Sequence, residues 1–419
     1  MKLKIHRGTG QIGGNVIEIA TDDGDTRIIL DCGQNLPPLD GSKAPDNIDI
    51  PGLTSGPNKY DAVFISHHHG DHCGLLGRVN DNVKLYMSKE TRAILEVIAD
   101  FLDKPTPREG VTLAPRVDVH VGGIKVRPFS VKHSAHGAMM FLVEADDQTL
   151  LYTGDFNDIS EEDFSLLRDI DILLCEGTNV TVQNDRTEDS LWTDAKAIME
   201  QSEGAVFVLC STTNIDRIIA IEKACQDSNR TIAIDPFMNA VLDKIEHKLV
   251  KKPVGFLSYY VEAGKNPRTD KYIYQENVNP PKVLSGFYSW DEVAGKAKSS
   301  RLTFMVRQSM GTFIRGLNKR KALDGATLVY SMWRGYENTE DTSKFLDLCR
   351  SFGMRVEYLH VSGHAYRDQI KCTVQELAPR ALVPIHTESA ESFLELHNTV
   401  VILKNGWTLN CESLQVEVE

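Results

Sequence analysis

The sequence predicts an α/β protein in which a region of stacked sheets is followed by a region built around a parallel sheet. Over roughly the first 190 residues, short apolar strands follow one another with turn signals and few helices, which favours sheets packed on sheets. From about residue 194, amphipathic helices separate the strands, the pattern of a parallel sheet. With 419 residues, 41% hydrophobic and 25% charged, the chain can form a sizeable core and more than one domain.

The stacked-sheet region begins with three predicted strands, at residues 2–7, 15–20 and 26–32. Asp23-Gly24 lies between the second and third strands and is a hairpin signal. The later strand segments are YDAVFISH, NVKLYMS, VDVHV, GIKVRPFSV, MMFLVEA and QTLLYTG.

The alternating region starts with the predicted helix DAKAIMEQ. It continues with strand AVFVLC, helix IDRIIAIEKACQ, strand TIAID and helix MNAVLDKIEHKL. Helix and strand segments also alternate in the last third of the chain, from TLVYSM to SAESFLELH. The sequence closes with Asn405-Gly406 between two apolar segments, which predicts a second hairpin.

The composition indicates a soluble, cytoplasmic protein with no membrane association. The N-terminus has no apolar run of signal-peptide length, and no window approaches the roughly 20 apolar residues of a membrane helix. The eight cysteines form no CxxC pair and lie mostly in apolar segments, which is typical of reduced core thiols.

The net charge of −13 argues against broad nonspecific binding of nucleic acid. Residues 291–321 are an exception, because eight lysines and arginines against two acidic residues give this run a local charge of +6. Two interpretations stay open: a solvated helix face, or a track for a nucleic-acid backbone.

A glycine pattern near the N-terminus resembles a dinucleotide site but has the wrong context. Residues 8–13 match GxGxxG, and Asp31 follows about twenty residues later. That mechanism needs a helix N-terminus directly after the glycines, whereas residues 15–31 alternate and turn as a hairpin. We therefore expect a tight turn between strands and no nicotinamide or flavin site.

The strongest motif is His67-His68-His69-Gly70-Asp71-His72, which follows the apolar strand DAVFIS. Residues i and i+2 of an extended segment face the same side, so His67 and His69 can bind one ion. Asp71 and His72 begin the next helix and can face a second ion. Imidazole with carboxylate suits zinc, and also manganese or iron. The alternative is a solvated loop, but four histidines and one aspartate in six residues favour a metal site.

One loop cannot complete two metal sites, so further ligands are expected elsewhere. His133, Asp155 and His386 each follow an apolar strand, where a sheet presents side chains to an open cleft. Asp155 is well placed to bridge two cations. His68 faces away from its neighbours in an extended segment, so we expect it behind the ligands or at the surface.

Taken in order, these motifs resemble those of the metallo-β-lactamase superfamily. HxHxDH at residues 67–72, His-Ser at 133–134 and Thr-Gly-Asp at 153–155 look like its successive motifs. Residues 175–179, with sequence CEGTN, and residues 384–386, with sequence PIH, resemble segments of its β-CASP nuclease branch.

Two further segments are similar to the ribonuclease J family within that branch: HVSGHA at 360–365 and STTNIDRI at 211–218. The resemblance runs over essentially the whole chain. It implies an αββα metallo-β-lactamase sandwich with an inserted α/β β-CASP domain. The implied division is residues 1–193 for the first part of the sandwich domain, 194–345 for the insertion and 346–419 for the closing part.

The resemblance implies two divalent metal ions, zinc or else manganese, at the motif residues. The implied ligands are His67, His69 and His133 for one ion, Asp71, His72 and His386 for the other, and Asp155 as the bridge. Asp71 also counts as catalytic, together with His364, which would contact the scissile phosphate, and Glu176, which would orient the site through a ligand histidine. The implied substrate-binding residues are His360, Val361, Ser362, Gly363 and His364. Asp31 resembles a motif that is more structural than catalytic.

The activity implied is that of a metal-dependent ribonuclease, which hydrolyses phosphodiester bonds of single-stranded RNA through a hydroxide bound by both ions. Two alternatives stay open: a DNA nuclease or small-molecule phosphodiesterase of the same fold, and a non-catalytic, metal-stabilised RNA-binding module. The intact ligand set weighs against the second. Whether cleavage is exonucleolytic or endonucleolytic stays open. The oligomeric state, including a homodimer, also stays open, because the ribonuclease J family has a further C-terminal domain involved in assembly.

Two features depart from the ribonuclease J pattern. His136 stands where that family tends to have a different polar residue. Residues 330–336, with sequence YSMWRGY, are more aromatic than the resemblance leads us to expect. Both features lie where the protein could recognise its substrate.

Overall fold

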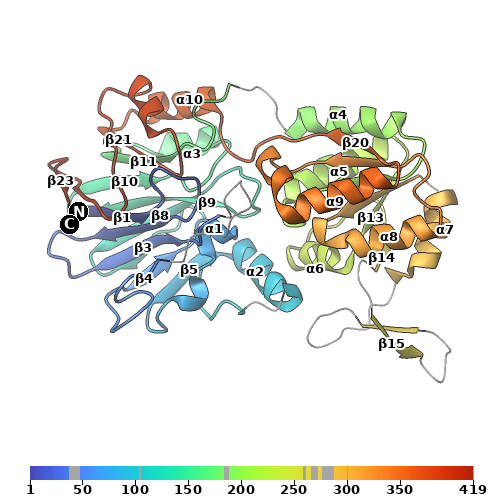
Figure 1. Ribbon diagram of the computed structural model, residues 1–419. Helices are drawn as coiled ribbons and strands as arrows, with labels where there is room; N and C mark the ends of the chain where they lie inside the picture. The colour runs from blue at the N-terminus through green and yellow to red at the C-terminus, as the bar shows by residue number, and fades with distance from the viewer. Residues whose placement is uncertain are drawn as a thin grey trace.

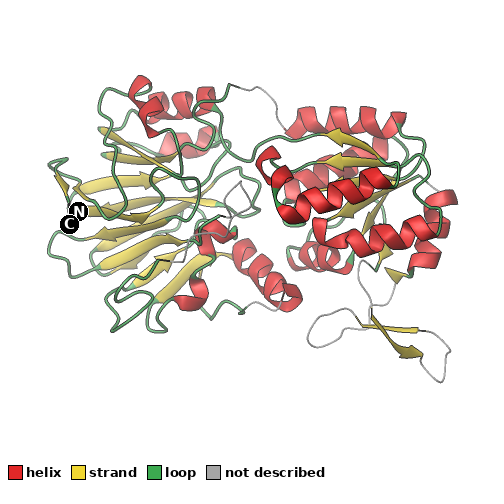
Figure 2. Cartoon of the chain, in the orientation of Figure 1, coloured by secondary structure: helices red, strands yellow, loops and turns green. Residues whose placement is uncertain are grey.

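The computed structural model of the protein describes residues 1–36, 48–102, 105–183, 188–257, 261–265, 272–275, 287–299 and 301–418. These residues form a two-sheet domain and a second domain around a parallel sheet (Figure 1, Figure 2). Both chain ends lie on the two-sheet domain, so the parallel-sheet domain is an insertion within it.

The first sheet of the two-sheet domain has eight strands in the order β23-β22-β1-β2-β3-β4-β5-β6. Their bounds are β1 Lys2–Arg7, β2 Val16–Ala20, β3 Arg27–Cys32, β4 Ala62–Phe64, β5 Lys84–Ser88, β6 Val111–Leu113, β22 Thr408–Asn410 and β23 Val416–Glu417. β2 and β3 pair antiparallel across the Asp23-Gly24 turn, which confirms the first predicted hairpin.

The second sheet has six strands in the order β21-β11-β10-β9-β8-β7. Their bounds are β7 Val119–Val121, β8 Ile124–Ser130, β9 Met139–Ala145, β10 Gln148–Tyr152, β11 Ile172–Glu176 and β21 Ala381–Ile385. β10, β11 and β21 run parallel, so their carboxyl ends meet at one edge of the sheet.

The two sheets bury one core between them and one apolar layer on each outer face. Fully buried side chains such as Ile17 and Phe64 of the first sheet share a cluster with Phe141 and Leu174 of the second. Helices complete the outer layers: α1 Gly70–Cys73, η1 Leu76–Arg78 and α2 Lys89–Leu102 beside the first sheet, and α3 Glu161–Leu166, α10 Arg367–Leu377 and η4 Ala390–Glu395 beside the second. This arrangement confirms the predicted αββα sandwich.

The inserted domain contains a seven-stranded sheet in the order β17-β14-β13-β18-β12-β19-β20, and every pair in it is parallel. The strands are β12 Val206–Leu209, β13 Thr231–Ile234, β14 Val254–Phe256, β17 Phe287–Tyr288, β18 Leu302–Val306, β19 Thr327–Tyr330 and β20 Arg355–Tyr358. β15 Val261–Lys265 and β16 Tyr272–Gln275 pair only with each other among the described residues.

Helices cover both faces of this parallel sheet. The apolar sides of α4 Glu188–Gln201, α5 Ile215–Asp227 and α6 Pro236–Lys244 share one buried cluster with the sheet. Those of α7 Trp290–Ser299, α8 Gly311–Lys319 and α9 Glu340–Ser351 share another. The remaining short helices are η2 Gln308–Met310 and η3 Arg334–Asn338. The predicted strand and helix alternation is therefore correct.

The bounds of the inserted sheet and its helices can be compared with the expected division at residues 194 and 345. α4 begins at Glu188, six residues before the expected start at 194. β20 pairs with β19, so the inserted sheet extends to Tyr358 and the expected end at 345 falls inside α9. β20, with sequence RVEY, contains two charged residues, whereas β21, with sequence ALVPI, is apolar throughout. The pairing of each strand shows the sheet to which it belongs.

The predicted hairpin at Asn405-Gly406 is wrong, although a turn is present there. The segment before the turn forms no strand, and Val401 donates its N–H to the Leu382 carbonyl of the second sheet. β22, after the turn, pairs with β1 of the first sheet. Among the described residues, no helix is long and apolar enough to cross a membrane.

Candidate metal centre

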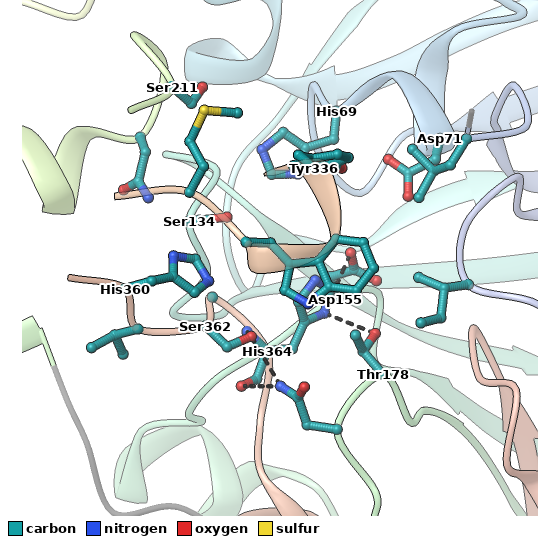
Figure 3. Close-up of a pocket in the computed structure, with 18 of the residues that line it drawn as sticks. His69, Asp71, Ser134, Asp155, Thr178, Ser211, Tyr336, His360, Ser362 and His364 are labelled. Atoms are coloured by element: carbon teal, nitrogen blue, oxygen red, sulfur yellow. Dashed lines mark hydrogen bonds and ion pairs between the residues drawn. The ribbon is translucent and has the colours of Figure 1, made fainter. Parts of the chain in front are cut away.

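The predicted ligands all follow carboxyl ends of strands, at one edge of the sandwich. The loop of residues 66–72 follows β4, His133 follows β8, Asp155 follows β10 and His386 follows β21. This edge faces the inserted domain across a cavity of about 370 Å³. Figure 3 shows side chains from both domains around this cavity.

The first predicted ligand group is brought together as expected. His67, His69 and His133 each offer a ring nitrogen, and these atoms lie within 4.8 Å of one another. The Nε2 atom of His133 is 3.3 Å from Nδ1 of His69. His67 and His133 are buried, and the three rings meet edge to face.

The second predicted group, Asp71, His72 and His386, also converges within 4.8 Å. Nε2 of His386 is 3.3 Å from Oδ2 of Asp71, and Nε2 of His72 is 3.8 Å from the same oxygen. All three side chains are buried.

Asp155 lies between the two groups, as a bridging carboxylate requires. Its Oδ2 is 3.1 Å from Nε2 of His72 and 3.8 Å from Nε2 of both His67 and His133. Its Oδ1 is 3.6 Å from Nε2 of His386. The side chain is 2% exposed, so water does not solvate this carboxylate freely.

These residues fit a metal on the evidence of their own unsatisfied atoms. Nε2 of His67, Nε2 of His72 and Oδ1 of Asp155 are buried and have no hydrogen-bond partner within the described part of the chain. Buried polar atoms normally have partners, so atoms of this kind facing one point require an explanation. A donor set of imidazole and carboxylate is one that zinc, manganese and iron accept.

The ring nitrogens on the far side of the histidines are held by hydrogen bonds. Nδ1 of His72 is 2.7 Å from Oδ2 of Asp31, which also accepts from the Tyr152 hydroxyl at 2.7 Å and the Ser66 hydroxyl at 2.8 Å. Asp31 is fully buried and has a φ of 58°. Such a partner fixes the ring orientation and tautomer, so Asp31 is a positioning residue, in line with its expected structural role.

Three other histidines are held in the same way by neighbouring elements. Nδ1 of His133 donates to the Gly363 carbonyl at 2.7 Å, and Nδ1 of His386 is 2.9 Å from the Thr178 hydroxyl. Nδ1 of His67 is 3.0 Å from the Ser66 hydroxyl. The Nε2 atoms of these rings are thereby turned toward the centre.

Burial and mutual repulsion keep most of the histidines neutral, the form in which imidazole binds metals. They lower the pKa of His67 and His133 well below the ordinary value, and burial lowers that of His69 to about 4. His72 differs: burial favours its neutral form, but the carboxylates of Asp155, Asp31 and Asp71 raise its pKa well above the ordinary value.

His364 lies next to this centre and is held by Glu176. Nδ1 of His364 is 3.0 Å from Oε1 of Glu176. It is also 3.2 Å from the Thr178 hydroxyl (Figure 3). Burial favours the neutral ring, but the carboxylates of Glu176 and Asp155 raise the pKa of His364 to about 9. Glu176 was expected to act through a ligand histidine, whereas its carboxylate bonds His364 directly.

The expected substrate-binding residues 360–364 all line the cavity. Position 363 requires a glycine, because a Cβ there would lie 2.6 Å from the Ser134 hydroxyl oxygen. The Ser362 hydroxyl accepts from the Asn179 amide at 2.9 Å. Val361 differs from its neighbours, since its side chain is 3% exposed and packs in the core beneath the cavity.

Two other expectations near the loop have different outcomes. His68 belongs to none of the ligand groups found among the described residues, but it is 3% exposed and therefore not at the surface. The GxGxxG segment joins β1 to β2, as predicted. It also reaches the metal centre, because a Cβ on Gly13 would lie 2.6 Å from Oδ2 of Asp71.

The basic run of residues 291–321 lies mainly on α7 and α8, at the side of the inserted domain away from the two-sheet domain (Figure 1). Arg320 pairs there with Asp291 at 2.6 Å. Arg307 is nearer the cavity, but its guanidinium pairs with Asp235 at 2.6 Å. This placement favours the solvated helix face over the backbone track.

Sequence reasoning did not assign roles to Thr178 or Ser66. Thr178 lies in the CEGTN segment, and its hydroxyl contacts both His364 and His386. Its position in the sequence could have indicated this role, because Thr178 lies two residues after β11, and the carboxyl end of β11 meets that of β21.

Two family models match the chain. The model described as a beta-lactamase superfamily domain covers residues 26–209, and the one described as a Zn-dependent metallo-hydrolase RNA specificity domain covers residues 352–396. The two-sheet fold agrees with the first of these descriptions. Residues 26–209 therefore match a metallo-β-lactamase domain, and the two matches together support a β-CASP protein similar to ribonuclease J.

Within this superfamily, the chain is similar to ribonuclease J. It is 25% identical to ribonuclease J of Sinorhizobium meliloti over 393 residues, which are 87% of this chain and 64% of that protein. It is 21% identical to ribonuclease J of Mycoplasma genitalium over 92% of this chain and 68% of that protein. The chain thus spans about two thirds of the length of these relatives.

A solved structure shows the same fold over nearly the full length of both chains. The crystal structure of a protein of unknown function from Enterococcus faecalis V583 matches with a TM-score of 0.73 and 20% identity. The match covers 97% of this chain and 99% of that one.

Proposed function

We propose that this protein is a metal-dependent ribonuclease that hydrolyses phosphodiester bonds of single-stranded RNA. The observation that carries the proposal is the convergence of two ligand groups on Asp155 at a cavity that His364 also lines. The similarity to ribonuclease J supports RNA as the substrate.

We propose that two divalent ions, zinc in preference to manganese, bind to the seven ligand side chains. The ligands would be His67, His69 and His133 for one ion, Asp71, His72 and His386 for the other, and Asp155 for both. When bound, such ions supply Lewis acidity, which activates water and neutralises charge on a phosphodiester.

The chain's own residues orient the substrate and place a proton donor beside it. His364 is held by Glu176 and Thr178, and the Glu176 carboxylate raises its pKa and so favours the protonated ring. A protonated imidazole can hydrogen-bond a phosphate oxygen and supply a proton to the departing oxygen. The loop of residues 360–363 forms the adjoining wall, where the Ser362 hydroxyl is available to a second phosphate oxygen.

The test is cleavage of 5′-labelled single-stranded RNA by zinc-loaded protein, with DNA of the same sequence and a chromogenic phosphodiester as competitors. We expect cleavage of the RNA and its loss in His67→Ala, a variant whose folding is checked by circular dichroism. Intact RNA with the wild-type protein, both with a 5′-monophosphate and with a 5′-hydroxyl, would contradict the proposal. If DNA or the chromogenic ester is cleaved in preference to RNA, that compound and not RNA is the substrate.

A further inference from the structure

The cavity at the metal centre has two unlike sides. The two-sheet domain contributes His69, Asp71, Asp155 and other ionisable groups. The inserted domain contributes no ionisable carboxylate or amine to the lining, but two aromatic side chains, Trp333 and Tyr336, with neighbouring neutral residues. A ligand that fills this space therefore has one charged part and one flat, uncharged part.

Trp333 is the most exposed aromatic side chain of this lining. It is 40% exposed, although a tryptophan loses favourable burial when it is left in water. Its ring centroid lies 5.4 Å from that of Tyr336 at an interplanar angle of 87°, so the two rings meet edge to face and are not stacked on each other. Tyr336 reaches toward the metal centre, near the Asp71 carboxylate (Figure 3).

The backbone around Trp333 holds the indole in place. A Cβ on Gly335 would lie 2.2 Å from the indole ring, so only glycine lets the ring lie against the backbone of η3. The Tyr330 hydroxyl donates to the Trp333 carbonyl at 2.8 Å. An exposed ring with a fixed orientation is suited to stacking, because little side-chain freedom is lost on binding.

A buried arginine links this aromatic segment to the loop beside the metal centre. The Arg217 guanidinium donates to the Ser331 carbonyl at 2.9 Å and to the Val361 carbonyl at 2.9 Å. Arg217 is 1% exposed. The buried Arg217 contacts therefore fix the distance between the segment that carries Trp333 and the loop of residues 360–364.

The same side of the cavity carries groups that can bond the edge of a flat ligand. Oδ1 of Asn214 accepts from the Arg217 backbone N–H at 3.0 Å and caps α5. Its Nδ2 makes no hydrogen bond within the described residues and is free to donate. The Ser211 hydroxyl also lines the cavity.

We propose that Trp333 forms a nucleobase subsite: the base of a nucleotide stacks on the indole while its phosphate lies toward the metal centre. The inference rests on the proposed function and adds a specificity-determining residue to it. Aromatic side chains commonly bind single-stranded nucleic acid by stacking, which is tolerant of base identity because every base has a π-face.

The experiment compares two probes that differ only in the base. Zinc-loaded protein is titrated with adenosine 5′-monophosphate and with ribose 5-phosphate by calorimetry, for wild type, Trp333→Phe and Trp333→Leu. We expect wild type and Trp333→Phe to prefer the nucleotide. Trp333→Leu should lose about 5- to 150-fold in affinity for the nucleotide, the range of one stacked base, and nothing for the sugar phosphate.

Trp192→Leu is the matched control, because Trp192 lies on α4 and does not line the cavity. It should bind both probes as wild type does. Equal wild-type affinity for the two probes, no binding of either, or equal nucleotide binding by Trp333→Phe and Trp333→Leu would overturn the subsite.

Different results would contradict the nucleobase subsite and the proposed ribonuclease function. RNA cleavage with a KM unchanged in Trp333→Leu would overturn the subsite and leave the ribonuclease standing. Base-dependent nucleotide binding by a protein that cleaves no RNA would do the reverse.

Discussion

At the scale of single residues, the candidate site depends on hydrogen bonds that aim each ligand. Thr178 serves two rings at once, His386 at 2.9 Å and His364 at 3.2 Å. Removal of such a partner commonly costs 10- to 100-fold in metal affinity, because the ligand ring is no longer fixed.

Thr178→Val should therefore weaken zinc binding by about 10-fold or more, while Thr178→Ser, which keeps the hydroxyl, should bind zinc as the wild type does. Competition with a chromophoric chelator measures the dissociation constants. Wild-type zinc affinity in Thr178→Val would show that the hydroxyl does not position His386.

Glu176→Gln tests the protonation of His364. Glu176 raises the pKa of His364, and the ring is protonated below its pKa. Removing the negative charge lowers that pKa, so the loss of activity with rising pH should begin at a lower pH in the variant. The profile of kcat against pH measures this shift. A profile displaced toward higher pH, or one that is unchanged, would contradict the role given to His364.

The residue types at this centre could be predicted, but several of their partners could not. His67, His69, Asp71 and His72 lie in one short motif after a strand, so their spacing is visible in the sequence. The contact between Thr178 and His386 depends instead on the parallel pairing of β11 with β21, more than 200 residues apart. No local pattern records that pairing.

At the scale of elements, the metal loop is held by a close approach to the end of β3. A Cβ on Gly33 would lie 1.7 Å from the Asp71 carbonyl oxygen, and Gly33 donates its N–H to the Asn15 carbonyl at 2.9 Å. The Asp71 carbonyl in turn accepts from the Asn15 N–H at 3.0 Å. The loop can therefore take its position only if residue 33 has no side chain.

Gly33→Ala should lower the free energy of unfolding by about 1–3 kcal/mol, the range for an overpacked site, and should also weaken metal binding. Gly295→Ala is the matched control, since a Cβ there meets nothing within 4 Å and the residue lies within α7. That control should be stabilised by up to about 1 kcal/mol. Urea denaturation measures both changes, and a Gly33→Ala protein as stable as the wild type would refute the packing argument.

The sequence predicted which elements occur better than where the domains divide. Apolar alternation and helical periodicity identified most strands of the two-sheet domain and several strands and helices of the inserted domain, but not α2. β20 pairs with β19 of the inserted sheet, and this long-range pairing could not be predicted from the residues of β20 alone. The turn at Asn405-Gly406 was recognised, but its flanking segments pair with Leu382 and β1 instead of with each other.

At the scale of the whole molecule, the candidate ligands and the inserted domain are separate in structure. All seven candidate ligands follow strands of the two-sheet domain, and none of them lies on a described helix or strand of the inserted domain. Ligand binding stabilises the folded part that contains the site by mass action.

Chelation of bound metal should therefore lower the melting temperature of the two-sheet domain by several degrees. The inserted domain should be affected less, through the packing of α2 against α6. Differential scanning calorimetry with and without a chelator checks this. An unchanged thermogram after complete removal of metal would show that the centre does not support the fold.

Metal dependence is tested by measuring RNA cleavage as zinc is returned to metal-free protein, with bound metal per chain determined on the same samples. We predict that cleavage rises with bound zinc, saturates near two ions per chain and yields 5′-phosphate and 3′-hydroxyl ends. Asp155→Asn should remain folded yet bind less metal and cleave no RNA. Cleavage by metal-free protein, or full cleavage by Asp155→Asn, would contradict the central claim.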